Sequence, residues 1–206
     1  MDFFSRRRFL RRGLVITGLA ALARNGVAAV VTPRATEGPF YPTPVMRFND
    51  TDNDLVKVRG KVEEAGGDVI HLHGNIRSKS GQPLVGYRIE IWQCDVNGKY
   101  LHPGDDSNIE YDTGFQGFGY DITDADGAYR FRTIKPTPYP GRTPHIHVKV
   151  LDGHREKLTT QFYIADEPSN RSDGVFRRMS VAEADSVSMV FVMNEGLLTT
   201  NIDLVI

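Results

Sequence analysis

Apolar and polar residues alternate in several short segments of the chain, and clusters of turn-forming residues separate these segments. Alternation with a period of two is typical of a β-strand with one buried face, because successive side chains point to opposite sides. Asp-Ala-Asp-Gly at 124–127 adds a strong hairpin signal. The pattern predicts strands over residues 69–76, 87–93, 128–134, 145–150, 158–164, 186–192 and 201–206.

Two stretches lack this alternation. Residues 103–116 are polar and rich in Gly and Asp, and residues 166–181 are similar, with room for one helical turn. We find no βαβ rhythm and no internal repeat. Many short strands with frequent turns predict an all-β protein, an antiparallel β-sandwich or barrel.

The first 29 residues have a different character. Ser-Arg-Arg-Arg-Phe-Leu-Arg-Arg at 5–12 precedes an apolar run at 14–23, followed by small residues. This is the pattern of a secretory signal, and its apolar run is too short for a comfortable transmembrane helix. Ser-Arg-Arg-x-Phe-Leu resembles the twin-arginine export signal. A basic amphipathic anchor or an uncleaved tether is the alternative.

This interpretation divides the chain into a signal peptide, residues 1–29, and a mature domain, residues 30–206. Cleavage could follow Ala23 or lie near Ala28 and Ala29. We expect the twin-arginine export machinery as a partner, a periplasmic or secreted location, and no stable membrane span after processing.

Charge narrows the choice of partners. The whole chain of 206 residues has a net charge of −1, but residues 1–29 hold six arginines and one acid. The remainder has 19 basic and 25 acidic residues and no Lys/Arg cluster, which argues against a nucleic-acid partner. The single cysteine, Cys94, allows no intrachain disulfide and no Cys-based zinc site; inside an apolar run it is typical of a small buried residue.

Two His-x-His pairs are candidates for metal binding. His145 and His147 share one face of their strand, which suits two imidazoles on one metal ion. His71 and His73 have the same spacing and similar apolar neighbours. Alternation alone cannot choose between the pairs, and either one alone could be part of a polar sheet face.

Two tyrosines change this picture. Tyr139 lies between Pro138 and Pro140 and shortly before Arg142. Because proline fixes φ, the tyrosine is held at low entropic cost, and its place beside a His pair suggests a phenolate ligand. A strong Lewis acid removes the phenol proton at neutral pH, and the hard phenolate suits Fe³⁺. Tyr100 follows a tight turn; taken alone, it would be a half-buried packing residue.

Several motifs, in order along the chain, resemble the intradiol ring-cleavage dioxygenases, and in particular those of the protocatechuate 3,4-dioxygenase type. They are Thr-Glu-Gly-Pro-Phe-Tyr-Pro at 36–42, Ile-Trp-Gln at 91–93, Asn-Gly-Lys-Tyr-Leu-His at 97–102, and the segments 123–136, 138–147 and 157–163. The resemblance covers residues 36–165. It implies an antiparallel β-sandwich of the prealbumin-like type with long active-site loops.

The resemblance also implies a site. A non-haem Fe³⁺ would be held by Tyr100, Tyr139, His145 and His147, with Tyr139 displaced when substrate binds. Arg142 falls beside the reacting ring, and Gln161 falls close to the metal. Phe40 and Tyr41 are weaker candidates for lining the pocket.

The implied reaction is cleavage of a catechol by O₂ to a cis,cis-muconate-type diacid that keeps both oxygen atoms. The substrate stays open among protocatechuate, catechol, hydroxyquinol and substituted relatives. Thr143 stands where family members often have proline, and Gly141 stands where protocatechuate enzymes tend to have tryptophan, so the pocket wall is expected to be more open. Exposed sheet edges would allow a homo-oligomer.

Two other functions fit parts of the pattern. One is a transthyretin-like β-sandwich that binds a ligand without catalysis. The other is a metalloenzyme that uses both His-x-His pairs on Zn²⁺ or Cu²⁺, which requires His71 and His73 to reach the same site as His145 and His147.

Overall fold

Five strands form where the alternating pattern predicts them. They are β1 (Val69–Arg77), β2 (Arg88–Trp92), β4 (Ala128–Ile134), β5 (His145–Asp152) and β6 (Arg155–Ile164). The structure, a computed structural model, describes residues 30–206. The expected signal peptide, residues 1–29, lies outside the described residues.

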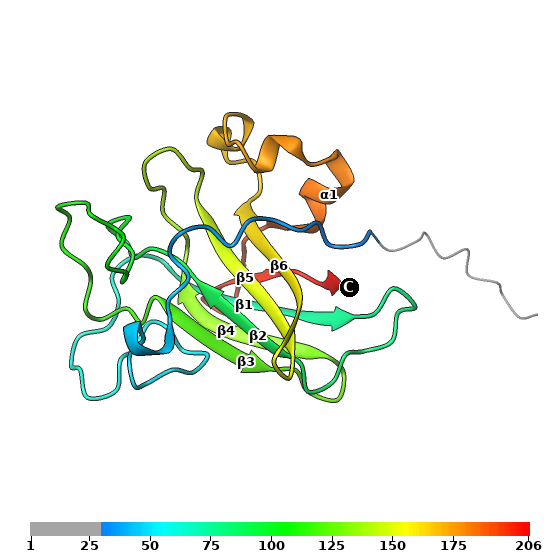
Figure 1. Ribbon diagram of the computed structural model, residues 1–206, viewed down its shortest axis with the longest axis horizontal. Coiled ribbons are helices and arrows are strands. Elements are labelled where there is room, and N and C mark those ends of the chain that lie inside the picture. Colours follow the sequence, from blue (N-terminus) through cyan, green and yellow to red (C-terminus); the bar gives the residue numbers. More distant parts are fainter. Residues whose placement is uncertain (1–29) are drawn as a thin grey trace, which may run out of the picture.

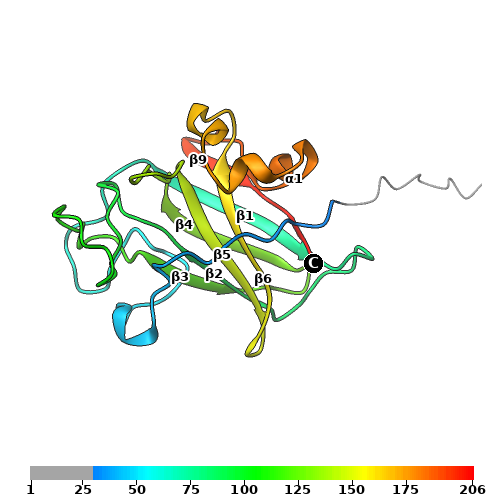
Figure 2. The ribbon, with the colours of Figure 1, turned by 45° about the horizontal axis from the view of Figure 1, so that its top comes forward.

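Two sheets form the sandwich (Figures 1 and 2). The first has the order β3-β2-β5-β6-β7, where β3 is Phe118–Ile122 and β7 is Ser188–Met189. In the second, β4 pairs with one side of β1, and β9 (Leu197–Asn201) and β10 (Leu204–Val205) pair with its other side. β8 (Val192–Asn194) pairs with β9. The prediction of an all-β sandwich is confirmed.

The core lies between the inner faces of the two sheets. Apolar residues at alternate positions fill it, and they include Ile70 and Leu72 from β1 and Ile146 and Val148 from β5. These four side chains are fully buried. Because alternate residues of a strand point to opposite faces, the histidines of β1 and β5 point away from this core.

The sheets are mixed, whereas the sequence pattern predicts purely antiparallel ones. β9 and β10 run parallel to β1, and β7 runs parallel to β6. The segment expected as one strand at 186–192 is divided between the end of a helix, β7 and the start of β8. β3 was missed because Gly117 and Gly119 interrupt the alternation of its segment.

Residues 166–181 hold more helix than expected. Two 3₁₀ turns, η2 (Pro168–Arg171) and η3 (Phe176–Arg178), precede α1 (Val181–Ser186). The Ser180 side chain accepts from the Glu183 backbone N–H, and the Glu183 carboxylate accepts from the Ser180 backbone N–H, which stabilises the start of α1. Within residues 30–206, no helix has the length and apolar character needed to cross a membrane.

Residues 30–48, here called the N-terminal strap, run across the outer face of β5 and β6 (Figure 1) and end in the 3₁₀ turn η1 (Pro44–Met46). Ala35 N donates to Thr159 O over 2.9 Å, and Glu37 forms an ion pair with Lys149. The strap therefore covers the outward-facing side chains of β5. All of the first six residues of this strand, including His145 and His147, are buried.

Candidate active site

A tight turn sets Tyr139 beside Arg142. Pro140 occupies the first central position, and Gly141 has a φ of 81°, the left-handed value that a type II turn requires at the second. Arg142 N donates to Tyr139 O over 3.1 Å and closes the turn. The two side chains emerge together, with Arg142 Nη1 3.4 Å from Tyr139 Oη. A Cβ on Gly141 would meet nothing within 4 Å, so the space beside this turn is open.

His145 and His147 converge on one point outside β5. Their Nε2 atoms are 3.1 Å apart, and both residues are 1% exposed. His145 Nδ1 lies 2.7 Å from Thr143 O. A proton on Nδ1 can be donated to this carbonyl, which leaves the Nε2 lone pair directed into the site. His145 is thus arranged as a metal ligand, and Nε2 of His147 lies close enough to bind the same ion once the proton between the two rings is displaced.

Burial keeps both imidazoles neutral. Burial, with the positive charge of Arg142 as a second cause, lowers the pKa of His145 to about 4. Burial also lowers the pKa of His147 well below its ordinary value, and the neighbouring His145 and Arg142 add to this effect. Metal ligation needs the neutral form of histidine, so both rings are in the required state at neutral pH.

His147 is clamped from two sides. The indole of Trp92 lies flat against the imidazole, with ring centroids 4.8 Å apart and planes 10° apart. Gly38 of the strap approaches so closely that a Cβ there would lie 3.1 Å from His147 Cε1. The ring orientation is therefore fixed by packing.

Tyr100 completes the cluster from the loop after β2. Its ring centroid is 5.4 Å from that of Tyr139 and 6.3 Å from that of His147, and Phe40 of the strap stacks on it at 4.6 Å. The Tyr100 hydroxyl is buried and has no hydrogen-bond partner among the described residues. Burial raises its pKa well above the ordinary value. An orphaned buried oxygen is unfavourable, and a bound cation would relieve that penalty.

The tyrosines differ in exposure. Tyr100 is 3% exposed, whereas Tyr139 is half-buried on its surface turn. Burial raises the pKa of Tyr139 as well, although the neighbouring Arg142 opposes that shift.

Cys94 packs beside Tyr100 and is buried, as predicted. Phe40 contacts the cluster directly, because its ring stacks on that of Tyr100. Tyr41 instead packs edge-on against Trp92.

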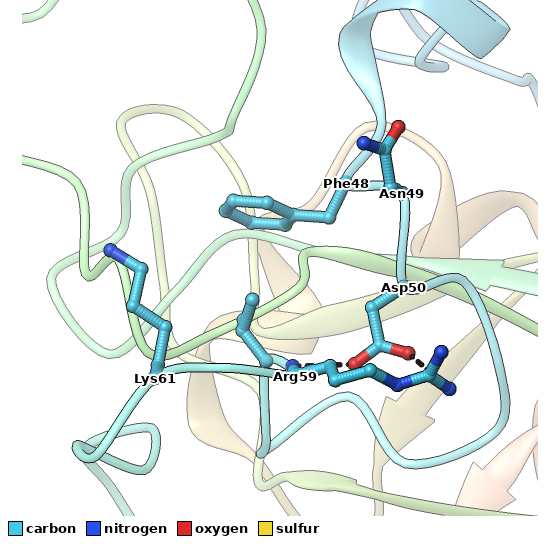
Figure 3. Close-up of a pocket in the computed structure, with 6 residues that line it drawn as sticks. Phe48, Asn49, Asp50, Arg59 and Lys61 are labelled. Carbon is cyan, nitrogen blue, oxygen red and sulfur yellow. Dashed lines mark hydrogen bonds and ion pairs between the residues drawn. The ribbon is translucent and has the colours of Figure 1, made fainter.

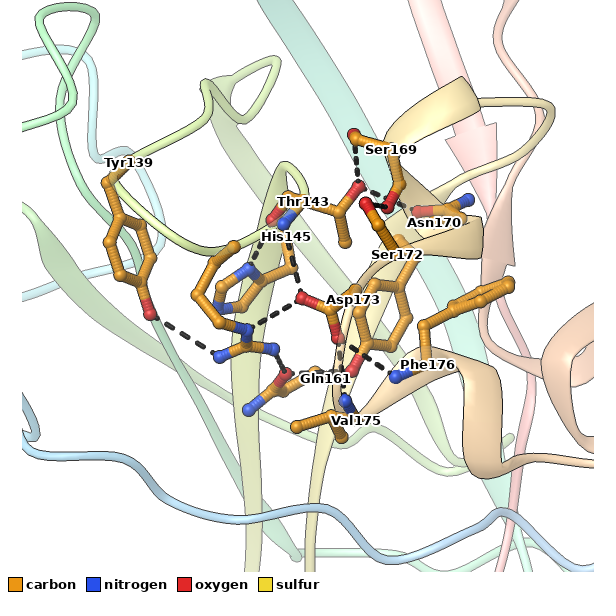
Figure 4. A network of polar contacts seen from close by, with 12 residues as sticks. Tyr139, Thr143, His145, Gln161, Ser169, Asn170, Ser172, Asp173, Val175 and Phe176 are labelled. Carbon is orange, nitrogen blue, oxygen red and sulfur yellow. Dashed lines mark hydrogen bonds and ion pairs between the residues drawn. The ribbon is translucent and has the colours of Figure 1, made fainter.

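A polar network holds Arg142 (Figure 4). Arg142 Nε donates to Asp173 Oδ2 over 2.7 Å, and Nη2 donates to Gln161 Oε1 over 2.6 Å. Gln161 Oε1 also accepts from Tyr163 Oη at 2.8 Å, and Gln161 Nε2 donates to Thr36 O at 2.8 Å. These partners assign the two ends of the amide, so Gln161 links the arginine to the strap.

The structure brings together all of the predicted site residues, namely Tyr100, Tyr139, Arg142, His145, His147 and Gln161. Sequence reasoning missed Asp173, Trp92 and Gly38. Of these, only Gly38 and Trp92 lie within motifs already singled out, and nothing in the sequence alone assigns them a role at the site.

The second His-x-His pair lies elsewhere. His71 and His73 are on β1 of the other sheet, opposite Arg132 and Arg130 of β4, and point away from the core. The hypothesis of one site using both pairs is therefore wrong. Within residues 30–206, no cluster of three or more His, Cys, Asp or Glu side chains could hold a metal ion. Tyrosine is not among these residue types, and the rings of Tyr100 and Tyr139 lie next to those of His147 and His145.

A surface pocket elsewhere holds none of the predicted site residues (Figure 3). Asp50 on its wall accepts from Arg59 N over 2.5 Å and pairs with the Arg59 guanidinium at 3.2 Å. The Asp50 carboxylate is thus already paired with Arg59, and we assign no reaction to this pocket.

Comparison of the sequence with known proteins identifies the family of this chain. Residues 36–188 match the family model Dioxygenase_C, described as Dioxygenase. The protocatechuate 3,4-dioxygenase beta chain of Burkholderia cepacia is 34% identical over 151 residues, 69% of this chain and 64% of that protein. Catechol 1,2-dioxygenase of Acinetobacter baylyi is 31% identical over 76% of this chain and 53% of its own length. The chain thus spans between about half and two thirds of these relatives.

Solved structures agree on the fold. The dioxygenase domain of a dioxygenase–carbohydrate-binding protein fusion from Streptomyces sp. SirexAA-E has a TM-score of 0.64 and 30% identity, over 86% of this chain and 98% of that one. An intradiol ring-cleavage dioxygenase from Tetranychus urticae has a TM-score of 0.67 at 20% identity, over 85% and 94% of the two chains. The chain belongs to the intradiol dioxygenase family.

Proposed function

We propose that the protein is an Fe³⁺-dependent intradiol dioxygenase that opens the ring of a catechol between its two hydroxylated carbons, using O₂. The observation that carries this proposal is the convergence of two tyrosines and two neutral histidines beside Arg142. Family membership supports it. A transthyretin-like binding module has no need of this constellation.

Tyr100, Tyr139, His145 and His147 would hold the metal. Phenolate oxygens are hard anionic donors and imidazoles are borderline, a set that suits Fe³⁺. The orphaned Tyr100 oxygen and the facing Nε2 atoms fit such an ion. When bound, ferric iron supplies Lewis-acid activation of the catechol and a template for its reaction with O₂.

The protein side chains would bind the substrate and move its protons. Tyr139 is the more exposed tyrosine, so it is the ligand that an incoming catechol can replace. Its freed oxygen would accept a proton from a catechol hydroxyl. Arg142 Nη1, 3.4 Å from Tyr139 Oη, would then face the substrate and stabilise negative charge developing on the ring. Gln161 would hold Arg142 in that position.

The substrate class follows from the same groups. A substrate with two adjacent hydroxyls would give one proton to Tyr139 and bring its ring beside Arg142, and the product would be a cis,cis-muconate-type diacid containing both atoms of O₂. The open space beside Gly141 would accommodate a ring substituent that points toward this turn. Protocatechuate, catechol and hydroxyquinol are the first substrates to assay.

We also propose that the mature protein is periplasmic or secreted and reaches that location through the twin-arginine pathway. The support is the arginine pair before a short apolar run within residues 1–29. Replacing Arg6 and Arg7 with lysine should leave the precursor in the cytoplasm. Export of the double variant at the normal rate would exclude this route.

The test of activity begins with the purified domain loaded with ferric iron. We expect about one iron per chain, visible absorption that shifts when catechol is added, and a ring-opened diacid labelled twice by ¹⁸O₂. A protein that stays colourless after ferric loading would refute the iron site. In that case a transthyretin-like β-sandwich that binds a ligand without catalysis becomes the better hypothesis.

A further inference from the structure

Asp173 lies at the centre of the network around Arg142, yet it comes from a part of the chain where no site residue was expected. It lies between η2 and η3, beyond β6, and its side chain is 0% exposed (Figure 4). A fully buried carboxylate is costly unless several donors surround it. The donors that surround Asp173 therefore indicate what it does.

The two oxygens of Asp173 have separate tasks. Oδ1 accepts from the backbone N–H groups of Val175 and Phe176, each at 2.9 Å, and so folds its own segment. Oδ2 accepts from Arg142 Nε at 2.7 Å and from Thr143 N at 3.2 Å, so it holds the turn that carries Arg142. The residue thus ties the turn to the segment after β6.

The arginine is held at two of its three nitrogen atoms. Asp173 holds Nε, and Gln161 Oε1, itself fixed by Tyr163, holds Nη2. This leaves Nη1 directed toward Tyr139 Oη. Burial opposes charging of Asp173, but the hydrogen bond from Arg142 and three backbone N–H groups lower its pKa to about 2. The acid is therefore ionised at any working pH.

We propose that Asp173 is a positioning residue that fixes the Arg142 guanidinium with Nη1 aimed at the Tyr139 oxygen, beside which the substrate ring would lie. This inference rests on the proposed function for its catalytic consequence. A charge-assisted, buried bond to Nε restricts rotation of the long side chain, so the donor is preorganised before substrate arrives. Asp173 itself touches no reacting atom.

Asp173→Asn separates the two tasks. The asparagine oxygen can take the place of Oδ1 and keep the bonds from Val175 and Phe176, while its amide group replaces Oδ2 and faces the donors Arg142 Nε and Thr143 N. The matched control is Asp54→Asn, which breaks an acid–arginine contact of 3.1 Å with Arg132 on the outer face of the other sheet.

The first measurement needs neither metal nor turnover. In ¹⁵N-labelled, metal-free protein, the Arg142 Nε–H signal is assigned by its absence in Arg142→Gln. We expect its exchange with water to speed up about tenfold or more in Asp173→Asn, by loss of roughly 1.4 kcal/mol or more of protection, and to stay unchanged in Asp54→Asn. Equal protection in wild type and Asp173→Asn would overturn the proposal.

The second measurement is a double-mutant cycle on ring cleavage by the iron-loaded enzyme. We expect Asp173→Asn to lower kcat by about 10- to 100-fold with a smaller change in KM, because a misplaced donor mainly affects the transition state. In an Arg142→Gln background, Asp173→Asn should cause no further loss. Additive losses would show that Asp173 acts without Arg142, and the proposal would be wrong.

Two further outcomes are decisive. If wild type carries no iron and cleaves no catechol, the proposed function fails, and the exchange measurement alone decides whether Asp173 fixes Arg142.

If Asp173→Asn does not fold, Arg142→Lys replaces it. Lysine keeps a charge opposite Asp173 but cannot also reach Gln161 and Tyr139, so kcat should fall. Wild-type kcat in Arg142→Lys would refute the need for a fixed guanidinium.

Discussion

The indole of Trp92 lies flat on the imidazole of His147, with ring centroids 4.8 Å apart. Trp92 is on β2 and pairs in register with His147 on β5, so the contact is set by the sheet itself. It is also the only tryptophan in the sequence. The one indole fluorophore of the protein is therefore in contact with a proposed metal ligand.

Iron loading should quench the fluorescence of Trp92. A coloured, paramagnetic ion on His147 would be one ring away from the indole, whereas Ga³⁺, a colourless diamagnetic ion of similar charge and size, should leave most of the emission. The measurement is an emission titration of metal-free protein with each ion, with binding followed by metal analysis. Unchanged emission in protein shown to contain one iron per chain would contradict the assignment of His147 as a ligand.

The two His-x-His pairs provide a matched comparison for metal binding. We expect His145→Ala and His147→Ala to lose most bound iron, because each removes a ligand from the buried site. His71→Ala and His73→Ala should keep about one iron per chain, since these histidines lie on the outer face of the other sheet. Iron content by elemental analysis, with circular dichroism as a check of folding, decides between them. Loss of iron in both sets would mean that the site is not local to β5.

Much of the fold is visible in the sequence because alternation is a local property. The strands at 69–77 and 145–152 follow directly from it. The parallel pairing of β9 and β10 with β1 is not visible, because it depends on where the chain returns after α1. β3 was missed because glycines supply no side chains to show a pattern.

The same limit applies to the site. His145 and His147 have the same local pattern as His71 and His73. What separates them is the N-terminal strap, which lies about 100 residues earlier and packs against His147, whereas His71 and His73 are not buried. The sequence around Asp173 does not predict a role at the site, because Asp173 is one of several acids in a polar loop. Its role becomes visible only in the fold, where it contacts Arg142. The resemblance supplied ligands that the pattern alone could not choose.

The glycine at the type II turn should be needed for catalysis as well as for stability. Gly141→Ala places a Cβ at a φ of 81°, and we expect a loss of about 1 kcal/mol in unfolding free energy. Because the turn sets Tyr139 beside Arg142, kcat should also fall. Gly153, in the β5–β6 hairpin, has a φ of 58° and equally open space around it. Gly153→Ala should therefore lose similar stability and keep kcat. Equal effects of both changes on kcat would mean that the turn does not position the site.

The contribution of Asp173 to stability should depend on pH. Its pKa is lowered to about 2 in the folded protein, because hydrogen bonds from Arg142 and the backbone outweigh burial. A carboxyl group with a depressed folded pKa stabilises the protein above its unfolded pKa of about 4, and this stabilisation is lost as the pH falls through about 2. We expect wild type to exceed Asp173→Asn by about 2 kcal/mol in unfolding free energy above pH 4.

Urea unfolding of both proteins between pH 7 and pH 2 measures this difference. The difference should be constant at neutral pH, decrease below pH 4 and nearly vanish at the acid end, because a protonated Asp173 resembles asparagine in charge. A difference that stays the same down to pH 2 would assign the effect to packing and not to the ion pair. A difference that grows in acid would have the wrong sign for a carboxylate held ionised by Arg142, and would contradict the assigned contact.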